Sequence, residues 1–232
     1  MPKLPYKEYM SVLNKISKAI TSDLYLEDIL KLIVTLTANV MNAKTCALWL
    51  LDYESKELKI RATQSLSKEY LKERNIKIGE GIVGLVAKEK KPLVISNVLK
   101  NESYKEKELA KKEGFVSMLS VPMMVKKKVM GVINCYTIVD YKFTKSDIDL
   151  LITVANQAAV TIENTELIVK TKVVQEELET RKKVEKAKGI LMKEQKLTEN
   201  QAYNLIRKNS MDKRVLMRDI AEAIILSFDI KQ

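Results

Sequence analysis

The feature that most constrains this chain is the absence of helix breakers from its C-terminal part. All four prolines and five of the six glycines fall within the first 131 residues, which leaves Gly189 as the one glycine beyond Gly131. Proline and glycine are the residues that most disfavour a helix interior. The pattern therefore predicts an α+β part first and an all-helical part second.

The sequence from 144 to about 194 repeats apolar residues at helical spacing without a strong stop signal. It predicts one helix of roughly 45 residues, about 70 Å long, which needs a partner to bury its apolar side chains. Val160, Leu167 and Val174 stand seven residues apart. This spacing predicts a short, coiled-coil-like seam between parallel helices of a homodimer; the alternative is a helix that packs only on its own domain. Arg181 continues the row that starts at Val160, and the second row is Asn164, Thr171, Leu178 and Glu185, so the expected seam is partly polar.

Before the long helix, the sequence alternates between helical and extended patterns. Two helical stretches come first, at 6–20 and 24–41, and the second follows Thr21, Ser22 and Asp23, whose side-chain oxygens suit an N-cap. Five apolar runs of strand length follow, and we expect them to form a largely antiparallel sheet of five or six strands. The predicted strands are 45–52, 58–63, 92–96, 117–125 and 129–137.

Composition removes several classes of function. The chain has no histidine and two cysteines, Cys46 and Cys135, so a Ser-His-Asp or Cys-His triad and a histidine-ligated zinc or haem are excluded. Both cysteines stand among apolar residues of predicted strands, which indicates buried thiols. There is no signal-peptide pattern and no apolar run near the roughly 20 residues of a membrane span. We expect a cytoplasmic protein that is not an enzyme, without metal, haem or membrane contact.

The net charge of +11 is concentrated near the C-terminus. Residues 181–218 contain twelve basic and four acidic side chains. Such a concentration favours a phosphate backbone as partner, and the alternative is a solvated lysine-rich surface. If six of these charges contact phosphates of single-stranded loops, log K should fall with log salt at a slope of about −4.

Five motifs of the first part occur in an order and at a spacing that resemble GAF domains, over residues 1–165. They are Gly79-Glu-Gly-Ile-Val-Gly84, Pro92-Leu-Val-Ile-Ser-Asn-Val98, Ser120-Val-Pro122, Gly131-Val-Ile-Asn134 and Phe143-Thr-x-x-Asp147. The resemblance implies an antiparallel sheet flanked by helices on one face, with a small-molecule pocket over the other. No motif specifies the ligand. The expected pocket residues, which line the pocket or fill it, are Trp49, Phe115, Met118 and Tyr136.

The tail, residues 166–232, resembles the ANTAR domain, a three-helix RNA-binding module. The matching residues include Ala187-Lys-Gly-Ile-Leu-Met192, Ala202-Tyr203 and Arg207. The sequence departs from the family pattern at Lys196, which replaces the usual glycine, at Ile206, which replaces leucine, and at Ser210, which replaces alanine. Proteins that join GAF to ANTAR resemble bacterial transcription antiterminators, which bind two neighbouring stem-loops in nascent mRNA. The resemblance implies a signal-responsive homodimer with an RNA partner. The expected RNA-binding residues are Lys186, Ala187, Lys188, Gly189, Ala202, Tyr203, Arg207, Lys208, Arg214 and Arg218.

Other residues of the tail carry structural signals. Thr198-Glu-Asn-Gln201 is a capping box that starts the second tail helix, and Asp212 is expected to cap the third. Leu216 is expected in the core with Leu191, Leu205, Ile206, Ile220 and Ile224. Tyr203 either packs half-buried between helices or stacks on an unpaired base.

Two other functions remain open from the sequence. One is a DNA-binding regulator with a helix-turn-helix, although the expected turn at 208–212 lacks glycine and 215–217 is too apolar to read a major groove. The other is a GAF-fold thiol-dependent reductase that uses Cys135, which leaves the whole tail unexplained.

Overall fold

The computed structural model describes residues 6–20, 25–65 and 74–230. The expected N-cap residues Thr21, Ser22 and Asp23 lie outside the described residues. The chain divides into two compact units, Met1–Thr165 and Glu166–Gln232. Helix α5 (Lys145–Gln195) contributes residues to both units and is 51 residues long, and its ends lie within one residue of the predicted 144 and 194.

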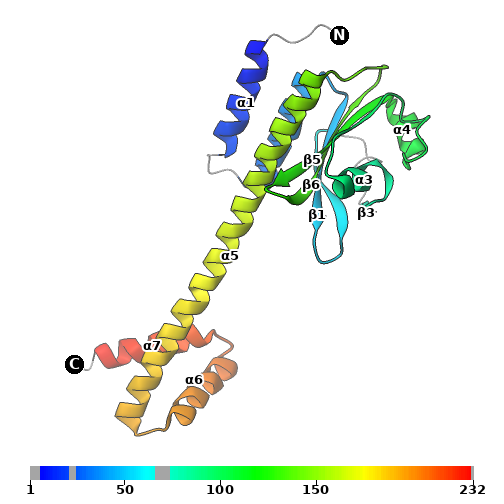
Figure 1. Cartoon of the computed structure of the whole chain (residues 1–232). Helices are drawn as coiled ribbons and strands as arrows, with labels where there is room; N and C mark the ends of the chain where they lie inside the picture. The colour runs from blue at the N-terminus through cyan, green and yellow to red at the C-terminus, as the bar shows by residue number, and fades with distance from the viewer. Residues whose placement is uncertain (1–5, 21–24, 66–73, 231–232) are drawn as a thin grey trace. The chain divides into compact units, whose positions relative to one another are not determined.

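The first unit is built on a six-stranded sheet with the strand order β3-β2-β1-β6-β5-β4 (Figure 1). Every pairing in it is antiparallel, which confirms the predicted sheet. The strand β3 was not predicted, because it has three residues of which only Ile76 is apolar. The strands are β1 (Thr45–Asp52), β2 (Glu57–Thr63), β3 (Asn75–Lys77), β4 (Leu93–Ile95), β5 (Ser117–Val125) and β6 (Lys128–Thr137).

Alternate residues of the central strands face two separate apolar cores. In β1, Cys46 and Leu48 join one core while Ala47 and Trp49 join the other, as the two-residue period of a strand requires. The first core lies under α1, α2 and the beginning of α5, and the second contains residues of α3 and α4 (Figure 1). These helices are α1 (Tyr6–Ile20), α2 (Leu26–Val40), α3 (Gly81–Glu89) and α4 (Lys107–Glu113).

Two motif glycines are required by close backbone packing. A Cβ atom on Gly131 of β6 would lie 1.9 Å from the carbonyl oxygen of Trp49, and one on Gly84 of α3 would lie 2.2 Å from the carbonyl oxygen of Lys77. Neither carbonyl can move without disturbing its strand, so no larger residue fits at these positions. The glycines thus fix how β1 meets β6 and how α3 sits beside β3.

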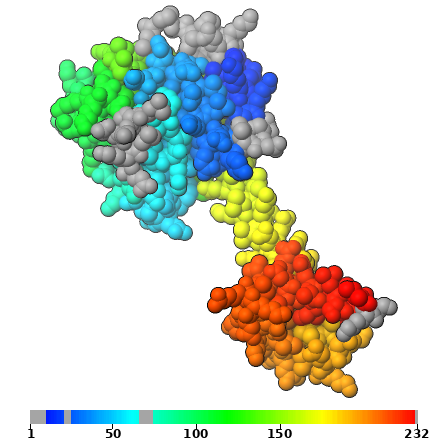
Figure 2. Space-filling view, turned by 180° about the vertical axis from the view of Figure 1, so that it is seen from behind, coloured from blue at the N-terminus to red at the C-terminus, as the bar shows by residue number. Residues whose placement is uncertain are grey.

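The second unit packs the end of α5 against α6 (Glu199–Lys213) and α7 (Met217–Asp229). Ala187, Ala202 and Ala221, one from each helix, are fully buried, and their small side chains let the three helices approach closely. In the space-filling view, α6 and α7 (orange to red) form much of the visible surface of this unit (Figure 2). The larger core residues are Val184, Leu191 and Ile206.

The turn between the last two helices differs from the prediction. Residues 208–212 are helical, because nothing in them stops α6, so the expected turn there was wrong. Asp212 therefore lies inside α6 and caps nothing. The helix ends at Arg214, which has a left-handed backbone (φ 54°). Leu216 is the N-cap of α7 and is 70 % exposed, not a core residue.

The turn between α5 and α6 follows the prediction in one respect. The backbone N–H of Gln201 donates to Thr198 Oγ1 at 3.3 Å, and that of Thr198 donates to Gln201 Oε1 at 2.9 Å, which is the predicted capping box. Lys196 itself takes the left-handed conformation (φ 55°) that glycine adopts more easily. The chain thus makes a glycine-type turn with a lysine.

Candidate nucleic-acid interface

The ten residues expected to bind RNA differ first in their burial. Ala187 and Ala202 are fully buried, so they bring α5 and α6 together rather than offer a surface. Gly189 is exposed, and a Cβ atom there would meet nothing within 4 Å. Packing among the residues that the structure describes therefore does not require glycine at position 189.

Lys188 lies beneath two carboxylates. It is only 6 % exposed, and its Nζ donates to Glu199 Oε1 at 2.7 Å and to the two carboxylate oxygens of Glu185 at 3.0 and 3.1 Å. The hydrogen bonds to Glu199 and then Glu185 raise the pKa of Lys188, and the same contact lowers the pKa of Glu199. Its charge is thus neutralised within the protein.

Lys183 and Lys186 of α5 and Arg218 of α7 are also paired with carboxylates. Glu222 accepts hydrogen bonds from Lys183 Nζ and, at 3.2 Å, from Arg218 Nε, and these contacts lower the pKa of Glu222. Lys186 Nζ lies 3.9 Å from a carboxylate oxygen of Asp229. Three of the predicted RNA contacts, at positions 186, 188 and 218, therefore already have acidic partners.

The outer face of α6 is different. Arg207 and Lys208 are exposed on the helix, and Arg214 is exposed at its C-cap. In the described part of the chain, no ion pair or side-chain hydrogen bond involves any of these three residues. Tyr203 is 41 % exposed and lies one helical turn before Arg207, on the same face. We call Tyr203, Arg207, Lys208 and Arg214 the α6 face.

The surroundings of Tyr203 are not uniformly basic. Tyr203 and Met217 line one side of a shallow groove, and on the other side α5 contributes Glu176, Glu177 and Glu185. The positive part of the α6 face therefore begins beyond Tyr203, towards Arg207. The tyrosine ring is placed where an acidic and a basic surface meet.

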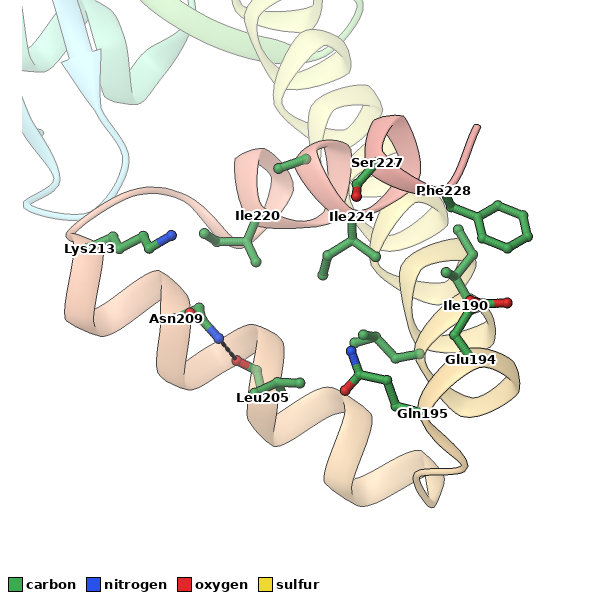
Figure 3. A pocket seen from close by; sticks show the side chains of 12 residues that line it. Ile190, Glu194, Gln195, Leu205, Asn209, Lys213, Ile220, Ile224, Ser227 and Phe228 are labelled. Carbon is green, nitrogen blue, oxygen red and sulfur yellow. Dashed lines mark hydrogen bonds between the residues drawn. The ribbon is translucent and has the colours of Figure 1, made fainter. Parts of the chain in front are cut away.

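A second groove of about 440 Å³ opens between α5, α6 and α7 (Figure 3). Its floor is apolar, with Leu205, Ile220 and Ile224, and Gln195 and Asn209 supply amides at its sides (Figure 3). None of the ten expected residues lines it. Sequence reasoning could not find this groove, because its apolar residues have the spacing of ordinary core positions.

The first unit contains a cavity of about 290 Å³ beside α3. Met118 and Tyr136, two of the four expected pocket residues, line it, whereas Trp49 and Phe115 are buried in the neighbouring core and are not among its lining residues. The ring of Phe115 stacks on that of Tyr136 with centroids 4.5 Å apart.

The polar wall of this cavity was missed by sequence reasoning. Arg74 forms an ion pair with Glu106, and Tyr104 lies beside them with a pKa raised mainly by burial. The three residues come from segments without regular periodicity or a motif. The cavity can hold a small molecule with both apolar and polar groups.

The two cysteines are buried, as predicted. Cys46 and Cys135 are directly opposite on β1 and β6, with their sulfur atoms 3.7 Å apart, and burial raises the pKa of Cys46. A raised pKa disfavours the reactive thiolate. Within the described residues, no cluster of acidic or cysteine side chains could hold a metal ion, and no helix is long and apolar enough to cross a membrane.

The fold and the distribution of charge define a two-part protein with an antiparallel-sheet domain and a basic three-helix module. The chain belongs to the GAF family, whose model matches residues 25–162, and carries an ANTAR domain at residues 172–225. The order of the two domains confirms the resemblance found in the sequence. The model of the GAF domain covers more than half of the chain.

Curated relatives match one domain or the other. A phosphoenolpyruvate-dependent phosphotransferase system protein of Escherichia coli is 26 % identical over 67 % of this chain and 21 % of its own length. The transcriptional regulatory protein PdtaR of Mycobacterium tuberculosis is 44 % identical over 22 % of this chain and 24 % of its own length. The chain thus spans about a fifth to a quarter of these relatives.

Solved structures support the fold of the first unit. The GAF domain of a phosphoenolpyruvate-protein phosphotransferase from Coxiella burnetii aligns with a TM-score of 0.65 at 22 % identity, over 71 % of this chain and 98 % of that one. A free methionine-R-sulfoxide reductase from Neisseria meningitidis aligns with a TM-score of 0.60 at 18 % identity, over 71 % and 95 %. At these identities the likeness concerns the fold alone.

Proposed function

We propose that this protein is a cytoplasmic transcription antitermination regulator that binds RNA. In this proposal the ANTAR units of a homodimer bind two tandem stem-loops in nascent mRNA. The GAF domain, residues 1–165, senses a small molecule or a partner protein, and the ANTAR domain, residues 166–232, carries the output. The protein is a regulator and not an enzyme.

The α6 face is the observation that carries this proposal. Arg207, Lys208 and Arg214 are exposed without an acidic partner among the described residues, so binding a phosphate requires no ion pair to break. Unpaired loop bases of RNA are commonly recognised by stacking on an aromatic side chain. Tyr203, half exposed one turn away, is suitably placed for this contact.

The homodimer is proposed from the surface of α5. Leu167, Val174 and Leu178 are more than half exposed in the single chain, and Val160 is 43 % exposed. They follow the seven-residue spacing of the expected seam, so a second α5 would remove their apolar side chains from water. Two linked RNA-binding units also gain avidity when their separation matches that of two stem-loops.

The two alternatives gain less support. The thiol-dependent reductase needs a reactive cysteine, but Cys46 and Cys135 are fully buried in the sheet. A DNA-binding helix-turn-helix needs polar side chains that are free to read bases at the start of the last helix. Val215 and Leu216, directly before α7, are exposed and apolar, and Arg218 in its first turn is paired with Glu222.

The test is binding of the purified full chain, in a salt series, to an RNA with two tandem stem-loops. A single stem-loop and a duplex DNA of equal length serve as comparisons. We expect the tandem RNA to bind most tightly, and a chain truncated after Asn164 to lose RNA binding. Equal, salt-sensitive binding to all three nucleic acids, or undiminished RNA binding by the truncated chain, would contradict the proposal.

A further inference from the structure

We infer that Lys188 is a positioning residue, which holds the first turn of α6 against α5 and does not contact RNA phosphates. The inference rests on the proposed RNA-binding function but reverses the role that the ANTAR resemblance gives to this lysine. It assigns the orientation of the α6 face to one ion cluster, formed by Lys188, Glu185 and Glu199.

The two carboxylates of the cluster are more exposed than the ammonium group of Lys188, so they keep phosphates away from it. The Lys188 side chain is 8 % exposed, whereas those of Glu185 and Glu199 are 58 % and 68 % exposed. An approaching phosphate would meet the two carboxylates first. With one positive and two negative groups, the cluster repels a phosphate rather than attracts it.

The cluster connects α5 to the beginning of α6. Glu199 is the first residue of α6, directly after the N-cap Thr198, and the turn before it contains the left-handed Lys196. The 2.7 Å contact from Lys188 Nζ to Glu199 Oε1 is therefore a cross-helix link at the point where the chain reverses. It limits how α6 can rotate about its own axis.

This link acts on the residues proposed to bind RNA. Glu199, Tyr203 and Arg207 are spaced four residues apart, so they form one row along α6. If the first residue of the row is fixed to α5, the other two are presented in a defined direction. Loss of the link would leave the direction of Tyr203 and Arg207 undefined, while every cation of the α6 face remains present to bind phosphates.

The experiment uses the full-length protein and a salt series with the tandem stem-loop RNA. The variants are Lys188→Met, Glu199→Gln and their combination, with Lys208→Met as the matched control because Lys208 is an exposed lysine of the α6 face. We expect Lys188→Met to weaken binding with an unchanged salt slope. Lys208→Met should instead reduce the slope by about 0.7, the value for one phosphate contact on a single strand.

Glu199→Gln gives the sharpest distinction, because the two roles predict opposite signs. The substitution removes a negative charge from an exposed position, so simple electrostatics predicts tighter RNA binding. Positioning predicts weaker binding, and it predicts that the combined variant is no weaker than Lys188→Met alone. Tighter binding by Glu199→Gln, or a slope reduced in Lys188→Met as in Lys208→Met, would overturn the inference.

Hydrogen exchange separates this inference from the proposed function. We expect the backbone amides of the first turns of α6 to exchange faster in Lys188→Met and Glu199→Gln than in the wild type, and unchanged exchange would overturn the positioning role. If the wild-type protein shows no preference for RNA, the proposed function fails, and the exchange result still decides whether the cluster holds α6.

Discussion

Basic side chains of the same three-helix unit are in two different electrostatic states. Lys183, Lys186 and Arg218 each lie beside a carboxylate of α7. Arg207 and Lys208, on α6, have no such partner among the described residues. The difference shows that the number of basic residues in a segment overstates the charge that a ligand can use, because internal ion pairs neutralise part of it.

The largest expected effect is on the stability of the second unit, whose apolar core lies beneath both the paired and the unpaired cations. Ile206 is fully buried, so Ile206→Ala should destabilise the second unit by about 2–5 kcal/mol. Leu205→Ala should cost less, because Leu205, the residue before Ile206, is only partly buried and lines the groove in Figure 3. Hydrogen exchange of α6 and α7 measures both. Equal losses of stability in Ile206→Ala and Leu205→Ala would contradict the position of the core in the structure.

Tyr203 tests whether the α6 face reads unpaired bases. We expect Tyr203→Ala to weaken binding to the tandem stem-loop RNA by about 1–3 kcal/mol, because stacking on one base has this size. Phe228→Ala is the control, since Phe228 is an aromatic residue at the groove between α5, α6 and α7, away from the α6 face (Figure 3). An equal loss of RNA affinity in both variants would contradict the proposal that RNA bases stack on the α6 face and not at the groove.

In the turn between α5 and α6, we expect a substitution that stabilises the second unit, by a smaller amount than the changes above. Lys196 has a left-handed backbone, which disfavours side chains with a Cβ, so Lys196→Gly should stabilise the second unit by about 0.5–1 kcal/mol. Lys193→Gly removes the same charge within helix α5 and should destabilise by about 1 kcal/mol. Thermal unfolding of the two variants, compared with the wild type, checks the signs. If Lys196→Gly destabilised the unit as Lys193→Gly does, this would contradict the left-handed backbone at Lys196.

The smallest expected effect is that of pH. The chain has no histidine, and ion pairs lower the pKa values of Glu199 and Glu222 below the ordinary 4.5. A lowered pKa in the folded state gives stability that is present above about pH 4.5 and lost as the pH falls through the folded value. Stability and RNA affinity should therefore stay constant from about pH 8 to 6. A transition in that range would show that another group titrates.

Much of the fold could be predicted because local sequence and tertiary structure agree. The alternation of Cys46, Ala47, Leu48 and Trp49 between two cores follows directly from the period of a strand, and the Thr198 capping box started α6 where expected. The strand β3 and the end of α6 could not be predicted. Their boundaries depend on pairing with Glu57–Lys59 and on a left-handed Arg214, neither of which has a local signal.

The candidate site was predictable in composition but not in geometry. Met118 and Tyr136 line a cavity and Arg207 lies on an exposed helix face, while their roles in binding stay predictions. The sequence could not reveal that Lys188 is covered, because its partner Glu199 lies eleven residues away, on the next helix. Such pairings depend on how helices cross, which is set by the whole core rather than by any short motif.

The most direct measurement of the central claim compares two triple variants that remove equal charge. One carries Arg207→Met, Lys208→Met and Arg214→Met on the α6 face, and the other carries Lys183→Met, Lys186→Met and Arg218→Met among the paired cations of α5 and α7. For binding to the tandem stem-loop RNA, the salt slope should decrease by about 2 in the first variant and stay unchanged in the second. Equal decreases in the two variants would show that net charge alone governs binding and would contradict the account.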